Sequence, residues 1–104
     1  MNIMVLFRRR QRSARLVGFA RRTLGFALDR FADRLGRATL RVSDVNGPRG
    51  GVDQRVSLEL QVAGGPSLHL QELDSSAERA VHTLARRAAR LVGKALARRR
   101  RGGR

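Results

Sequence analysis

Cysteine, tryptophan and tyrosine are all absent from this sequence of 104 residues. Without cysteine the chain cannot form disulfides, thiolate zinc sites, iron–sulfur clusters or a cysteine nucleophile, and a reducing compartment is allowed. Four phenylalanines make up the aromatic content, and the strands predicted below between residues 37 and 71 contain none of them. A mode of RNA recognition in which bases stack on aromatic side chains of a sheet is therefore nearly excluded.

Long hydrophobic runs are missing as well. The apolar run Ile3–Phe7 is far shorter than the ~20 residues that a helix needs to cross a bilayer. Arginines follow this run instead of preceding it, which is the opposite of the order in a secretory signal peptide. We expect a cytoplasmic protein with no membrane-spanning segment and no membrane partner.

Acidic residues are scarce. The chain has 8 Asp and Glu against 23 Lys and Arg, a formal net charge of +15, and Lys94 is the single lysine. The planar fork of arginine suits bidentate contacts with phosphate better than the ammonium of lysine does. A small protein with this charge repels its own copies and is attracted to polyanions. We therefore expect a monomer whose partner is a nucleic acid.

Hydrophobic residues make up 41% of the chain, which is enough for one modest core. We predict a single domain over residues 1–97. Residues 98–104 contain five arginines and two glycines, too charged and glycine-rich a composition to pack. We expect this segment to be a disordered basic tail.

The first third of the chain predicts a strand and then a helix. The strand covers Asn2–Phe7, a basic connection follows, and Ser13 is a suitable N-cap. Apolar residues then recur at steps of three and four as far as Leu35, which predicts an amphipathic helix of about six turns. Gly36 stands where a left-handed C-cap is expected.

After Gly36 the apolar residues alternate with polar ones. This period of two predicts strands over residues 37–43, 54–62 and 67–71, arranged as an antiparallel meander. Ser75-Ser76-Ala77-Glu78 has the spacing of a capping box, and an apolar stripe to Ala95 predicts a second helix. The fold class is α+β, a β-α-β-β-β-α two-layer sandwich with both helices on one face of a mainly antiparallel sheet.

The positive charge lies mostly on the predicted helices. Residues 42–78 carry a net charge of −4, so the remainder carries +19. Like charges spaced four residues apart on a helix are unfavourable, which suggests that an anionic partner compensates them. Arg30 flanks the core of the first helix. The candidate phosphate-binding residues face outward or follow the second helix: Arg15, Arg22, Arg79, Arg86, Arg87, Arg90, Lys94 and Arg98.

The sequence contains no convincing motif for catalysis, metal binding or nucleotide binding. His69 and His82 have no partner at the spacing of a metal site or a catalytic triad. Asp29 and Asp33 are expected to form ion pairs with Arg30, Arg34 and Arg37 in preference to binding magnesium. The glycine-rich loop 46–51 lacks the lysine and hydroxyl residue of a phosphate-binding loop. We expect no enzyme activity, cofactor, metal or small-molecule substrate.

Two segments carry a resemblance to a known family. Residues 28–35 (LDRFADRL) and, after a strand, residues 43–55 (SDVNGPRGGVDQR) resemble the short ribosome hibernation-promoting factors of bacteria. These proteins are also called ribosomal subunit interface or sigma 54 modulation proteins, and the resemblance covers roughly residues 19–97. It implies a non-enzymatic protein with a fold similar to double-stranded RNA-binding domains.

The resemblance also implies a function. Such factors bind the small ribosomal subunit between its head and body, where messenger RNA and the anticodon ends of tRNA would lie, and block translation in starved or stationary cells. The leading hypothesis is therefore a ribosome-associated translation inhibitor that binds rRNA phosphates. Two alternatives remain: a general binder of duplex RNA or DNA, and a regulatory protein-interaction module whose acidic end contacts another protein.

Overall fold

The computed structural model describes residues 1–45 and 54–102, and in α2 the side chains as far as Arg99. The glycine-rich loop 46–51 lies outside the described residues, as do residues 103–104. The elements are, in chain order, β1 (Asn2–Arg8), α1 (Ala14–Leu28), the 3₁₀ helix η1 (Asp29–Arg34), β2 (Leu35–Asp44), β3 (Gln54–Val62), β4 (Leu68–Asp74) and α2 (Ala77–Gly102).

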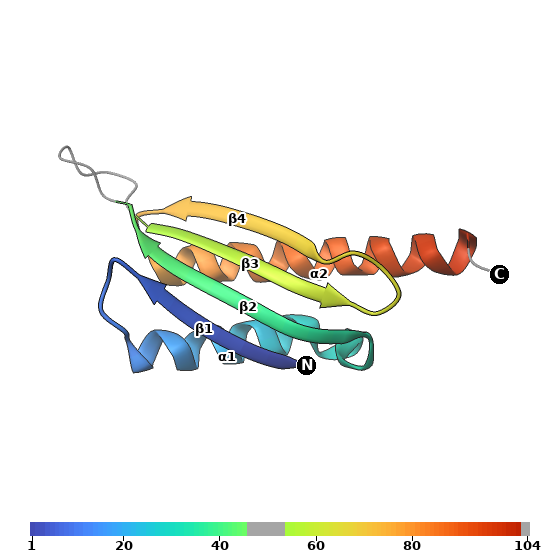
Figure 1. The fold of residues 1–104 in the computed structure, drawn as a ribbon, viewed down its shortest axis with the longest axis horizontal. Helices are drawn as coiled ribbons and strands as arrows, with labels where there is room; N and C mark the ends of the chain where they lie inside the picture. Colours follow the sequence, from blue (N-terminus) through green and yellow to red (C-terminus); the bar gives the residue numbers. More distant parts are fainter. Residues whose placement is uncertain (46–53, 103–104) are drawn as a thin grey trace.

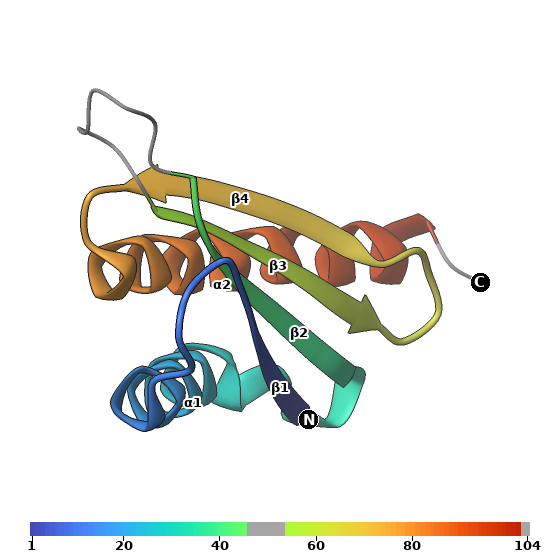
Figure 2. The ribbon, with the colours of Figure 1, turned by 60° about the vertical axis from the view of Figure 1, so that its left-hand side comes forward.

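The four strands form one sheet in the order β1-β2-β3-β4. β1 pairs with β2 in parallel, and β2, β3 and β4 form the predicted antiparallel meander. Both helices cover the same face of this sheet, where they lie side by side and run in the same direction (Figures 1 and 2). The predicted α+β fold, with the order β-α-β-β-β-α, is confirmed.

The core lies between the sheet and the two helices. Along β2 and β3 every second residue is inaccessible to solvent, as at Leu40, Val42 and Leu60. Leu24 of α1 and Leu84 of α2 meet these side chains from the helical layer and are equally buried. Because the strand period is two and the helix period is 3.6, the apolar pattern alone assigns these residues to the interior.

The first helix is shorter than predicted. Ser13 caps it as expected, since its Oγ accepts a hydrogen bond from the backbone N–H of Leu16 at 3.1 Å. However, α1 ends at Leu28, η1 follows, and Gly36 lies inside β2 instead of capping a helix. The cause is tertiary, because the chain must leave the helical layer early enough for Arg37 to pair with Asn2 of β1.

The start of α2 differs in detail from the predicted capping box. The cap is Ser76, whose Oγ accepts a hydrogen bond from the backbone N–H of Arg79 at 3.1 Å. The third residue of the helix is therefore Arg79 and not Glu78. The Asp74 carboxylate supports the same turn by accepting a hydrogen bond from the backbone N–H of Ser76 at 2.9 Å.

The end of α2 also differs from the disordered tail predicted from residue 98 onward. The helix continues to Gly102. Arginine is a good helix former, and the Arg99 guanidinium donates a hydrogen bond of 2.6 Å to the carbonyl of Ala63 in the turn between β3 and β4. Within residues 1–45 and 54–102, no helix has both the length and the apolar composition that a bilayer crossing requires.

Candidate nucleic-acid interface

A groove of about 960 Å³ runs between α1 and α2. Each side of it is lined by residues spaced four apart in the sequence, and within an α-helix this spacing places them on one face. The α1 side, continued by η1, contributes Arg22, Phe26 and Arg30, and α2 contributes His82, Arg86 and Arg90. Small residues line the rest of the groove: Thr23, Ala27, Ala85 and Ala89, together with the partly buried Phe19.

The groove is positively charged throughout. Four arginines line it, and no acidic residue does. In the part of the chain that the structure describes, none of these four guanidinium groups lies within 4.0 Å of a carboxylate. The groove therefore presents a set of uncompensated cations to solvent, which is the electrostatic requirement for binding a chain of phosphates.

Two of these arginines, Arg30 and Arg22, contact residues close to them in the sequence. The Arg30 guanidinium carbon lies 4.7 Å from the centre of the Phe31 ring, a cation–π contact. The Arg22 side chain lies against Gly18, where a Cβ atom would stand 3.2 Å from Arg22 Nη1. Phe31 in turn packs beside Gly93 of α2. Arg30 is thus held by a ring that itself contacts α2, whereas the support of Arg22 lies within α1.

The other predicted residues lie in different environments. The Arg79 guanidinium is 2.7 Å from Asp74, and the Arg87 guanidinium is 2.7 Å from Glu72 and 2.9 Å from the carbonyl oxygen of Gln71. Arg15 Nε lies 3.9 Å from the Glu78 carboxylate. Lys94 and Arg98 are exposed farther along α2.

The contact between Arg79 and Asp74 shifts the pKa values of both groups. Hydrogen bonds from its guanidinium, with a smaller contribution from the backbone of Ser76, lower the pKa of Asp74 below its ordinary value of 3.8. The same contact raises the pKa of Arg79. Asp74 and Arg79 therefore act mainly on each other at the start of α2.

Sequence reasoning missed three residues of the groove. Arg30 was placed beside the core, Phe26 was not singled out, and His82 was given no role. The signal was available, since residues 22, 26 and 30 and residues 82, 86 and 90 repeat at the spacing of one helical face. That these two faces line one groove depends on how the helices pack.

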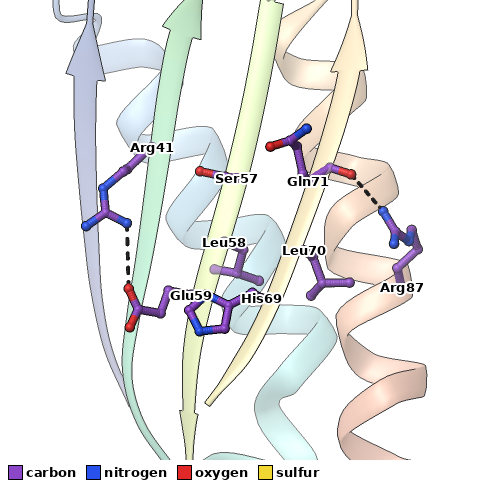
Figure 3. A pocket seen from close by; sticks show the side chains of 8 residues that line it. All are labelled: Arg41, Ser57, Leu58, Glu59, His69, Leu70, Gln71 and Arg87. Carbon is purple, nitrogen blue, oxygen red and sulfur yellow. Dashed lines mark hydrogen bonds and ion pairs between the residues drawn. The ribbon is translucent and has the colours of Figure 1, made fainter.

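The outer face of the sheet is different in character. A hollow of about 430 Å³ lies there. Arg41 lies 3.7 Å from Glu59, and His69 is directly opposite Glu59 on the next strand (Figure 3). The described strands β2, β3 and β4 contain no aromatic residue. Phe7 of β1 packs toward the core on the other face.

The acidic pair of η1 does not behave as predicted. Within residues 1–45 and 54–102, neither Asp29 nor Asp33 lies within 4.0 Å of an arginine or lysine nitrogen. The prediction assumed that an α-helix continues through these residues. In a 3₁₀ helix, residues four apart no longer share a face, so the expected neighbours of the two carboxylates do not lie beside them. No group of three or more metal-ligating side chains occurs among the described residues.

Comparison with known proteins bears on the fold. No family model matches the sequence, and no curated protein does. Two solved structures superpose with a TM-score of 0.75 each. The N-terminal domain of Thermus thermophilus protein Y is 21% identical and matches 90% of this chain and 98% of its own. A ribosomal subunit interface protein from Coxiella burnetii is 14% identical and matches 93% and 99%.

Each of these two similarities covers nearly the whole length of both chains compared. The chain therefore has the fold of ribosomal subunit interface proteins, which is the family that the sequence was found to resemble. Residues 46–53 of the second resembling segment lie outside the described residues.

Proposed function

We propose that the protein is a cytoplasmic, non-enzymatic translation inhibitor that binds the small ribosomal subunit as a monomer through phosphates of its rRNA. The principal contacts are made by the arginines that line the groove between α1 and α2: Arg22, Arg30, Arg86 and Arg90. Lys94 and Arg98 extend the same positive charge toward the end of α2, and Arg15 of α1 lies beside Glu78 at the start of α2.

One observation carries the proposal. Four guanidinium groups converge on a groove that no carboxylate lines, in a molecule with a net charge of +15. Phosphate is the partner that this donor geometry and charge fit best, because guanidinium–phosphate hydrogen bonds are charge-assisted and often bidentate. The fold shared with a ribosomal subunit interface protein supports the ribosome as the source of those phosphates.

The test is sedimentation of purified protein with isolated 30S and 50S subunits through sucrose gradients. We expect co-migration with the 30S subunit at low salt and release at high salt, since each neutralised phosphate contributes about −0.7 to −0.9 to the slope of log affinity against log salt. The double variant Arg86→Glu/Arg90→Glu should abolish co-migration.

A matched control reverses two arginines elsewhere. Arg8 and Arg55 are exposed and lie on either side of Ser43 in the sheet register. Arg8→Glu/Arg55→Glu changes the net charge by the same amount but should leave most of the binding intact. Equal binding to duplex RNA and DNA without subunit preference would favour the general nucleic-acid binder, and salt-independent binding would favour a protein partner.

A further inference from the structure

Phe26 is the most exposed large hydrophobic residue of the described chain. It is 89% accessible, whereas Phe7, Phe19 and Phe31 all pack against the core. Phe26 lies in the last turn of α1, and because its side chain is almost fully exposed it contributes nothing to the core. A single exposed apolar side chain needs no special explanation by itself, so its surroundings decide what it means.

Those surroundings are cationic. Arg22 precedes Phe26 by one helical turn and Arg30 follows it by four residues, and all three side chains line the groove. At a rise of 1.5 Å per residue, Arg22 and Phe26 lie about 6 Å apart along the helix axis. Arg86 and Arg90 of α2 line the same groove. One exposed aromatic ring, that of Phe26, thus lies among four guanidinium groups.

This combination fits a nucleotide better than other anions. Phosphates satisfy the guanidinium groups, and the face of the aromatic ring offers a stacking surface to a base. A regular duplex keeps its bases stacked inside the helix, so only an unpaired nucleotide can reach the ring. An anionic bilayer would need a broad apolar surface to insert, whereas Phe26 is the one exposed large hydrophobic side chain among the described residues that line this groove.

We infer that the groove between α1 and α2 binds a single-stranded segment of RNA, with one unpaired base stacked on Phe26 and the neighbouring phosphates on the four arginines. This inference rests on the proposed function, and it adds to phosphate binding a preference for unpaired over paired RNA. Phe26 is the residue that determines this preference.

The test compares three labelled RNAs by fluorescence anisotropy: a 12-nucleotide single strand, a blunt 12-base-pair duplex, and that duplex with one bulged adenosine. Phe26→Ala should weaken the single strand and the bulged duplex by about 5- to 150-fold, the range found for loss of one base–aromatic stack. The blunt duplex should change by less than about twofold. Because the side chain is exposed, the variant should fold normally.

Two further variants separate stacking from simple hydrophobic contact. Phe26→Leu keeps an apolar side chain without a π system and should lose as much affinity as Phe26→Ala. Phe26→Trp should bind at least as well as the wild type. The chain contains no other tryptophan, so quenching of the new indole emission by the bulged RNA, and not by the blunt duplex, would report the stack directly. Leu73→Ala, on the outer face of β4, is the control and should change nothing.

The outcomes distinguish this inference from the proposed function. If Arg86→Glu/Arg90→Glu abolishes binding to all three RNAs while Phe26→Ala changes none of them, the proposed function stands and the role of Phe26 is overturned. If the wild type binds none of the RNAs and no ribosomal subunit, the proposed function itself fails. Binding of anionic vesicles that depends on Phe26, without RNA binding, would also overturn the inference.

Discussion

The outer face of the sheet and the groove between the helices differ in whether acidic residues accompany their arginines. On the outer face of the sheet, Arg41 is bridged to Glu59, and His69 lies opposite the same carboxylate (Figure 3). In the groove between the helices, four arginines meet without any acidic residue. The groove is therefore the more favourable place for a polyanion to bind, and the net charge of +15 by itself did not identify it.

A second contrast separates the inner from the outer face of the sheet. Leu84 of α2 is fully buried against the inner face, whereas Leu73 of β4 is 49% exposed on the outer one. We expect Leu84→Ala to lower the free energy of unfolding by about 2–5 kcal/mol, because it leaves a cavity in the core. Leu73→Ala should change it by less than about 0.5 kcal/mol. Urea unfolding followed by circular dichroism measures both.

Substitution of arginines by alanine tests the contribution of the groove without placing negative charges next to the phosphates. Arg86→Ala/Arg90→Ala should weaken binding to the 30S subunit by about 10- to 100-fold at low salt and make the slope of log affinity against log salt less steep by about 1.4 to 1.8. Arg8→Ala/Arg55→Ala should alter the slope by less than half as much. Identical slopes for the two pairs would mean that binding depends on overall charge and not on the groove.

The Asp74–Arg79 pair predicts a pH-dependent contribution to stability. The pKa of Asp74 is lowered in the folded state, so the unfolded chain takes up a proton first as the pH falls. The stabilisation is present above pH 3.8 and is lost as the pH falls through the lowered folded value. Asp74→Asn should therefore be less stable than the wild type at pH 6, with a difference that shrinks below pH 3.8.

The control for this titration is Asp33→Asn. The Asp33 carboxylate is exposed, and none of the ion pairs in the described residues includes it. Its difference from the wild type should remain small at every pH in a series of urea unfolding curves between pH 3 and 7. A pH-independent difference for Asp74→Asn would contradict the assignment of the lowered pKa to the contact with Arg79.

The smallest expected effect concerns a glycine in α1. A Cβ atom at Gly25 would meet nothing within 4 Å, so alanine fits there without any shift. Gly25→Ala should raise the free energy of unfolding by about 0.5–1 kcal/mol, because alanine loses less conformational freedom in a helix. Since Gly25 does not line the groove, binding to the 30S subunit should be unchanged. Thermal unfolding and sedimentation measure the two effects.

The candidate site was predicted only in part. The outward spacing of Arg22, Arg86 and Arg90 along each helix is a local pattern, and it placed them correctly on exposed faces. Arg79 and Arg87 belong to the same pattern on α2, yet contacts with the last residues of β4 pair them with Asp74 and Glu72, respectively. Periodicity cannot distinguish these two outcomes, because it does not say which neighbour lies beside a helix.

The order of helices and strands, and the side of each that is buried, follow from the amino-acid sequence, because periods of two and 3.6 are properties of a local stretch of chain. The end of α1 depends on contacts between distant segments, since the pairing of β1 with β2 draws residues 35–44 into the sheet. The arrangement of Phe26 and four arginines around one groove depends on such contacts as well. That arrangement exists only where two helices distant in sequence pack side by side.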